Sequence, residues 1–205
     1  ETIDALVADD LATLFAGVSV KGNDGDESEL PEPEIGYAQS GGTTPAPIVS
    51  VVPNFGADGP GPNGGIAYKI DIPGVSGNQS TNSGLFTTDG RAIYLFEVSP
   101  QVVVGRYDDD DFSPPETSDP AAFAIHIDPA TGVLTVVQYV SIKHDDRGDS
   151  DEADDNNTAG NDAPPTDGTP DPQSIINGAL RVTVTVTDGD GDSDEFEASI
   201  GNKVV

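Results

Sequence analysis

Short runs of apolar and β-branched residues, separated by glycine, proline and acidic turns, recur along most of the chain. Such runs are typical of β-strands. In residues 181–187, RVTVTVT, valine alternates with threonine, so one face of this strand is expected to be apolar and the other polar. The pattern predicts an all-β fold, an antiparallel β-sandwich. Eight strands are expected, at residues 47–55, 66–72, 92–98, 102–107, 121–127, 133–142, 180–187 and 196–200.

Three local signals add detail to this expectation. Residues 128–132, DPATG, predict a turn in which aspartate starts the turn, proline presets φ and glycine supplies a positive φ. This turn is expected to join the antiparallel strands on either side of it. Apolar residues in the first 15 positions have a helical spacing and predict one short helix. Residues 145–172, rich in acids and prolines, are expected to form a long insertion outside the core.

Composition and charge exclude several classes of protein. The chain has 37 Asp and Glu against 8 Lys and Arg, a net charge of −29, so nucleic acid and anionic membranes are unfavourable partners. There is no cysteine, which excludes disulfides, cysteine-ligated metals and thiol catalysis. No apolar run approaches the roughly 20 residues of a membrane-spanning helix. We expect residues 1–205 to form one domain, a monomeric module excised from a longer chain.

The acidic residues are concentrated in loops. Of the 37 acids, 27 lie in residues 21–34, 108–119, 145–172 and 187–195, whereas the expected strands carry almost no charge. A salt-adapted protein would instead distribute its acids over all exposed strand positions. Packed carboxylates repel one another, so these loops either stay disordered or hold cations.

The most regular acidic loop is residues 188–195, DGDGDSDE, directly after an expected strand. Carboxylates at every second position, with glycines between them, can converge on one Ca²⁺, which takes about six to eight oxygen ligands. Mg²⁺ tolerates such an irregular site less well. The loop is not an EF-hand, because serines stand where that motif needs Gly and a bidentate Glu. Candidate ligands are Asp188, Asp190, Asp192 and Asp194, with Asp24 and Asp26 in a similar loop; a solvated acidic turn is the alternative.

Two further acidic loops each follow a strand and are expected to form a partly open cation site if they meet at one end of the sandwich. An open coordination position can accept the carboxylate of a ligand. The ligand-facing candidates are Asp108, Asp109, Asp110, Asp111, Asp145, Asp146 and Asp149. Among these loops the metal-ligand candidates are Asp110, Asp146, Asp151 and Glu152.

Catalysis receives little support from the sequence. Paired carboxylates suit a glycosidase or an aspartic protease, but no fixed motif accompanies them, and no nucleophile elbow, zinc-protease motif or phosphate-binding loop occurs. His126 is expected to be a core or face residue, and His144 a strand-end residue. The tripeptide at residues 147–149, RGD, recurs easily by chance in such a loop. We therefore expect a binding or structural module and no enzyme.

Several segments together resemble the repeat domain of giant type I-secreted RTX adhesins of Gram-negative bacteria. These segments are residues 55–59 (FGADG), 84–93 (GLFTTDGRAI), 103–106 (VVGR), 122–144 and 182–192 (VTVTVTDGDGD). The resemblance implies a Ca²⁺-dependent β-sandwich that is exported by a type I system and anchored at the cell surface through its parent adhesin. Part of that family is similar to peptide-binding domains, which grip the free C-terminus of a partner protein through a bound Ca²⁺.

The sequence thus favours an extracellular module that binds several Ca²⁺ ions and takes up a surface peptide or protein C-terminus on another cell. Two alternatives stay open. One is a structural spacer whose loops are rigidified by calcium. The other is a Ca²⁺-dependent sugar-binding module, against which the low aromatic content of 6% counts.

Overall fold

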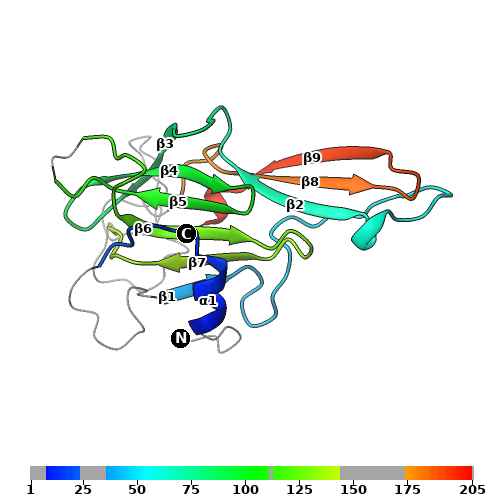
Figure 1. The fold of residues 1–205 in the computed structure, drawn as a ribbon, viewed down its shortest axis with the longest axis horizontal. Coiled ribbons are helices and arrows are strands. Elements are labelled where there is room, and N and C mark those ends of the chain that lie inside the picture. The colour runs from blue at the N-terminus through cyan, green and yellow to red at the C-terminus, as the bar shows by residue number, and fades with distance from the viewer. Residues whose placement is uncertain (1–7, 24–35, 111–112, 144–173, 205) are drawn as a thin grey trace, which may run out of the picture.

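The computed structural model describes residues 8–23, 36–110, 113–143 and 174–204. In these residues two antiparallel sheets pack face to face, which confirms the predicted all-β sandwich (Figure 1). The smaller sheet has the order β2 (Ile66–Asp71), β8 (Arg181–Thr187), β9 (Ser193–Ser199). The larger sheet has six strands, in the order β1 (Gly36–Gln39), β7 (Leu134–Gln138), β6 (Ala121–Ile127), β5 (Val102–Arg106), β4 (Ala92–Ser99) and β3 (Ser80–Phe86).

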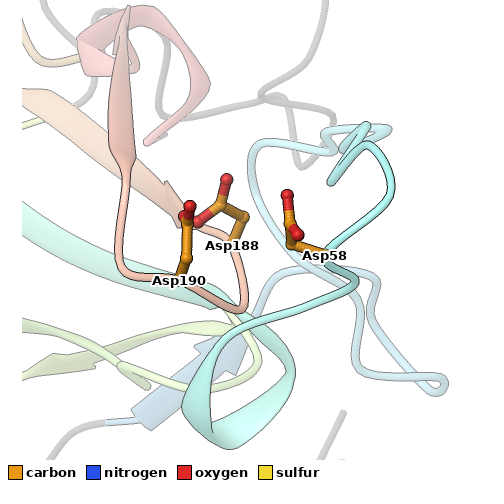
Figure 2. A group of neighbouring side chains, drawn as sticks. All are labelled: Asp58, Asp188 and Asp190. Carbon is orange, nitrogen blue, oxygen red and sulfur yellow. The ribbon is translucent and has the colours of Figure 1, made fainter.

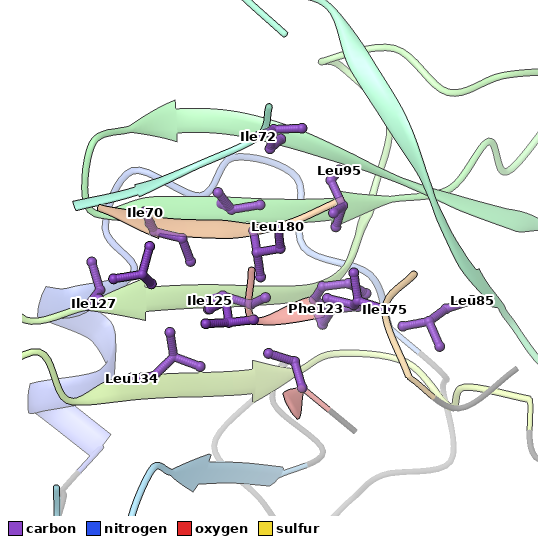
Figure 3. Close-up of a cluster of buried hydrophobic side chains, with 14 of the residues drawn as sticks. Ile70, Ile72, Leu85, Leu95, Phe123, Ile125, Ile127, Leu134, Ile175 and Leu180 are labelled. Atoms are coloured by element: carbon purple, nitrogen blue, oxygen red, sulfur yellow. The ribbon is translucent and has the colours of Figure 1, made fainter. Parts of the chain in front are cut away.

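The main core lies between the two sheets (Figure 3). Ile70 and Leu180 approach from the side of the smaller sheet, and Leu95, Phe123 and Ile125 from the larger one. All five side chains are at most 2% exposed, and burial of such side chains is the main favourable term in folding. In β8, Val182 and Val184 belong to this core, as the alternation in the sequence predicts, whereas Val186 is only half-buried and lies outside it.

Strand β2 joins the smaller sheet to the larger one. On one edge it pairs with β8. On its other edge, Tyr68 N donates to the Pro129 carbonyl at 2.9 Å and Ile70 N donates to the Pro100 carbonyl at 2.8 Å. These carbonyls belong to the turns that connect β6 with β7 and β4 with β5. The β8–β9 hairpin extends past the end of the six-stranded sheet, so its turn forms one tip of the molecule (Figure 1).

Most of the predicted strands are present. Five of them coincide with β2, β4, β5, β6 and β8 to within one residue at each end. The turn at residues 128–132 joins antiparallel β6 and β7, with Gly132 at φ +69°. The Asp128 carboxylate closes this turn by accepting hydrogen bonds from the main-chain N–H groups of Ala130 and Thr131. Strand β7 ends earlier than predicted, and β9 begins three residues earlier.

The strand predicted at residues 47–55 is wrong. These residues contribute only an isolated bridge between Pro47 and Val133, and Val52 is 98% exposed. Proline lacks the N–H that a ladder requires, and Pro47 and Pro53 stand near both ends of this apolar run. The run therefore forms no strand, although Val49 is buried in the main core.

The apolar pattern does not predict β1 or β3, the two edge strands of the larger sheet. Strand β3, STNSGLF, is mostly polar, and its register with β4 shifts between Asn82 and Phe86. Gly84, inside that shift, has φ +85°. Edge strands are exposed on one side and carry weaker periodicity, which explains both omissions.

The predicted short helix is confirmed as α1 (Ala8–Leu14), on the face of the larger sheet opposite the smaller sheet. Leu11 of the helix packs with Val104 and Val137 of the sheet, together with Phe15 and Val18, which follow the helix at a helical spacing. Two short 3₁₀ turns, η1 (Pro62–Gly64) and η2 (Gly201–Lys203), complete the described elements. Among these residues no helix is long and apolar enough to cross a membrane.

His126 packs at the α1 side of the larger sheet, with its ring edge-on to Phe15 at a centroid distance of 6.2 Å. Burial lowers the pKa of His126 below its ordinary value of 6.5, although Asp128 partly opposes this. The unfolded chain therefore takes up the proton first as the pH falls. The stabilisation that the neutral His126 ring provides is complete above the pKa of this histidine in the unfolded chain. It is lost as the pH falls toward the lower pKa of His126 in the folded domain.

Acidification is thus expected to reduce the free energy of unfolding of the wild type relative to that of His126→Gln. Urea unfolding at about pH 7.5 and about pH 5.5 measures this difference. His144→Gln, which removes the other histidine, is the matched control and should follow the wild type. If the wild type and His126→Gln show the same pH dependence, His126 does not carry the effect.

Candidate metal centre

Three carboxylates meet at the tip formed by the β8–β9 turn. Oxygen atoms of Asp58, Asp188 and Asp190 all lie within 4.8 Å of one another. Asp58 comes from the loop that precedes η1 and β2, whereas the other two come from the turn after β8 (Figure 2). Asp58 and Asp190 are exposed and Asp188 is half-buried. The cluster therefore joins two segments that are distant in sequence, and it faces solvent.

The β8–β9 turn is organised by Asp188. Its Oδ1 accepts hydrogen bonds from the main-chain N–H groups of Gly191 at 3.1 Å and Asp192 at 3.0 Å. Its own N–H donates to the Asp192 carbonyl at 3.0 Å. Gly191 has φ +101°, a conformation that favours glycine. One carboxylate oxygen thus fixes the turn.

Main-chain pairing holds the Asp58 loop beside this turn. Pro60 forms an antiparallel bridge with Asp188, and Gly61 N donates to the Thr187 carbonyl at 2.9 Å. Thr187 N in turn donates to the Gly65 carbonyl at 2.8 Å. The relative position of the three carboxylates therefore rests on backbone contacts.

Gly189 allows the closest approach of the two segments. A Cβ added at this residue would lie 2.2 Å from the main-chain oxygen of Asp58. A side-chain rotation cannot relieve this clash, because the oxygen belongs to the main chain. Gly189→Ala is expected to push the Asp58 loop outward, destabilise the domain by about 1 to 3 kcal/mol and weaken divalent-cation binding.

Urea unfolding and a calcium titration of Gly189→Ala measure both effects. Gly36→Ala is the control, because a Cβ there meets nothing within 4 Å. Wild-type stability and wild-type calcium affinity in Gly189→Ala would show that this contact does not constrain the site.

Hydrogen bonds favour the ionised form of Asp188. The largest cause that lowers the pKa of Asp188 is a hydrogen bond from the Asp190 carboxyl group; burial opposes it, and the N–H groups of Asp192 and Gly191 lower the pKa further. Among the described residues, no lysine or arginine forms an ion pair with any of the three clustered carboxylates. Their mutual repulsion would be relieved by a bound cation.

The donor set is suited to a hard cation. Carboxylate oxygens are the ligands that Ca²⁺ and Mg²⁺ prefer, whereas Zn²⁺ sites are built mainly from Cys and His. Three carboxylates fill only part of a Ca²⁺ coordination sphere unless all are bidentate, so water or another ligand would complete it. This acidic cluster can hold a metal ion.

Comparison with protein families assigns the chain to one family. Residues 5–201 match a family described as a domain of unknown function (DUF5801). The chain belongs to this family. No match was found among curated proteins or solved structures. The DUF5801 match spans both acidic segments of the cluster, since it includes the Asp58 loop and the β8–β9 turn.

The DUF5801 domain brings together two of the four aspartates predicted as ligands in the β8–β9 loop. Asp188 and Asp190 lie in the cluster, whereas Asp192 and Asp194 are outside it. The Asp194 Oδ1 instead accepts a hydrogen bond from the Glu195 N–H at 2.9 Å. Sequence reasoning missed Asp58 as a candidate ligand. The signal available for it was an aspartate between turn-forming glycines in residues 55–59.

The first of the predicted ligand-facing loops follows β5 in the DUF5801 domain. Asp108 is 6% exposed, and its carboxylate accepts hydrogen bonds from Asp110 N at 2.9 Å and from the Ser113 hydroxyl at 2.5 Å. Arg91 donates to the Asp108 carbonyl. The Asp108 side chain therefore stabilises its own loop, while Asp109 and Asp110 are exposed. Among the described residues, these three aspartates do not join a metal-ligand cluster.

The remaining candidates fall outside the described residues of the DUF5801 domain, and their roles stay predictions. They are Asp24, Asp26, Asp111, Asp145, Asp146, Asp149, Asp151 and Glu152.

Proposed function

We propose that this domain is a Ca²⁺-dependent ligand-binding module of a secreted bacterial adhesin. In this proposal it binds the free C-terminus of a peptide or protein on another cell, and a bound Ca²⁺ contacts the ligand carboxylate. The observation that carries the proposal is the convergence of Asp58, Asp188 and Asp190 within 4.8 Å at an exposed tip. The adhesin context and the extracellular location come from the resemblance to RTX adhesin repeats.

Calcium is the cation that we propose for this cluster. The three ligands are hard oxygen donors on irregular loops, which suits the flexible coordination of Ca²⁺ better than the strict octahedron of Mg²⁺. Extracellular calcium sites typically bind at about 10⁻⁴ to 10⁻³ M. Such a site is empty in the cytosol and loaded outside the cell. Further Ca²⁺ ions are proposed for the other acidic loops, which hold most of the chain's 37 acids.

The exposure of the cluster supports a role in ligand binding. Asp58 and Asp190 are exposed, so coordination positions of a bound ion would face solvent. A terminal carboxylate is itself a hard oxygen donor and can replace water there. Main-chain groups of the surrounding loops would then fix the last residues of the ligand.

A structural role is the second candidate, and one observation favours it. The segments that an ion would link are already paired through the Pro60–Asp188 bridge and the Gly61–Thr187 hydrogen bond. Calcium would reinforce this joint and stiffen a spacer domain. The two functions differ in whether the ion keeps a coordination position for a ligand.

Calorimetric titration with peptides separates the two functions. We expect a peptide mixture with free C-termini to bind in Ca²⁺, the same peptides with amidated C-termini to bind at least about tenfold more weakly, and neither to bind in chelator. Asp58→Asn should reduce binding of the free peptides. Equal binding, or no binding, of free and amidated peptides would exclude carboxylate recognition and leave the structural role.

A further inference from the structure

Strand β9 presents a free edge of the smaller sheet. It pairs with β8 on one side, and no described strand lies on its other side. At the end of the ladder with β8, Ile200 N donates to the Leu180 carbonyl at 3.0 Å. Main-chain groups alternate between the two edges of a strand, so those of Phe196 face β8, whereas those of Glu195 and Glu197 face away from it.

The outward main-chain groups of β9 are open to a partner. Within the described part of the chain, no hydrogen bond reaches the Glu197 N–H or the carbonyls of Glu195 and Glu197. The Glu195 N–H donates to the neighbouring Asp194 carboxylate at 2.9 Å. All residues from Ser193 to Glu197 are exposed, and β9 contains no proline. Such an edge is a template for the addition of a further strand.

An exposed aromatic ring lies in the middle of this edge. Phe196 is directly opposite Val184, so both side chains lie on the core side of the smaller sheet. Val184 is fully buried, whereas Phe196 is 53% exposed. A β-branched side chain on an added strand would pack beside the Phe196 ring, and aromatic residues form favourable cross-strand pairs with such side chains.

The charge of the edge specifies the partner. Strand β9 carries Asp194, Glu195 and Glu197 and no basic residue. The side chains of Glu195 and Glu197 are 55% and 51% exposed, although they form ion pairs with Lys69 and Arg181. Like charges opposite each other destabilise a strand pair, so the edge disfavours a second copy of β9 and favours a basic strand.

We propose that β9 is a docking edge for an extended basic peptide segment, which adds to the smaller sheet as a fourth strand. Lysine or arginine of this segment lies opposite Glu195 and Glu197, and a β-branched residue lies opposite Phe196. The added strand forms main-chain hydrogen bonds with the two glutamates. The docking edge uses none of the clustered aspartates and needs no free C-terminus, so it is independent of the proposed calcium-dependent function.

Titration of the capped peptide acetyl-TKVKVKT-amide into the ¹⁵N-labelled domain, in chelator and followed by amide chemical shifts, tests this proposal. The peptide should bind saturably, shift the resonances of Glu195, Phe196 and Glu197, and slow hydrogen exchange at the Glu197 N–H. Methylation of the main-chain nitrogens of its lysines, whose N–H groups face β9 in this register, should weaken binding at least about tenfold. The matched control of equal charge is methylation of the valine nitrogens, which face solvent and should change the affinity less than about threefold.

Two variants of the domain test the edge itself. Phe196→Ala should weaken binding of the unmodified peptide at least about threefold, and Glu195→Lys at least about tenfold. Glu116→Lys makes the same change in net charge at an exposed position outside β9 and should bind like the wild type. The amide spectra verify that each variant is folded.

Four results would overturn the proposal. Equal effects of the two methylations would exclude a strand in this register. Equal effects of Glu195→Lys and Glu116→Lys, or shifts spread over the other acidic loops, would show nonspecific attraction to an acidic chain. Resonance shifts at β9 that depend on protein concentration without peptide would identify a second copy as the partner.

Discussion

Asp58→Asn is expected to weaken calcium binding at the β8–β9 tip at least about tenfold, a difference of about 1.4 kcal/mol. The substitution keeps the size of the side chain but removes one of three charged ligands, and ligand charge is a main determinant of calcium affinity. Asp188→Asn should have a larger effect, because Asp188 also fixes the turn through its hydrogen bonds to Gly191 and Asp192.

Calcium titrations followed by calorimetry and by amide shifts of the tip residues measure this effect site by site. The matched control is Asp192→Asn, in the same turn but outside the cluster. It should change the affinity of the tip site less than threefold, a difference of about 0.7 kcal/mol. Thermal unfolding in chelator verifies that all variants are folded. An effect of Asp192→Asn as large as that of Asp58→Asn would show that the cluster is not the ligand set.

Phe123→Ala is expected to lower the free energy of unfolding by about 3 to 5 kcal/mol, a large part of the stability of a typical domain. Phe123 is 2% exposed in the core between the sheets. Its ring lies over Gly105 of the neighbouring strand, where an added Cβ would be only 2.4 Å away. Removing the ring leaves a cavity that the paired strands cannot close.

Phe196→Ala is the control for the loss of an aromatic ring. Phe196 lies on the edge strand β9 and is 53% exposed, so its removal should cost less than about 1 kcal/mol. Urea unfolding of both variants gives the comparison. Similar losses for the two variants would mean that the core does not depend on Phe123 as the packing indicates.

The fold was predictable from sequence where the apolar pattern was strong. Strands β5 and β6 are buried on nearly every position, and their runs of β-branched and small apolar residues are evident in the sequence. The edge strands β1, β3 and β9 show little apolar alternation in the sequence, because many of their side chains are exposed or only half-buried. The opposite error occurred at residues 47–55, where prolines prevent a strand despite the apolar composition.

The candidate site was only partly predictable. The alternation of aspartate and glycine after β8 identified Asp188 and Asp190, because both stand in one local turn. Asp58 could not be assigned as their neighbour, since the register of β2 against β8 brings its loop to that turn. Asp192 and Asp194 fit the same alternation but lie outside the cluster, and the alternation alone does not distinguish them from Asp188 and Asp190.

A crystal structure of the domain grown in calcium tests the proposed function most directly. We expect a Ca²⁺ ion at the β8–β9 tip, with oxygens of Asp58, Asp188 and Asp190 at about 2.3 to 2.6 Å and with at least one coordination position held by water or a ligand carboxylate. No ion at this cluster, or an ion enclosed entirely by protein oxygens, would contradict calcium-mediated ligand binding.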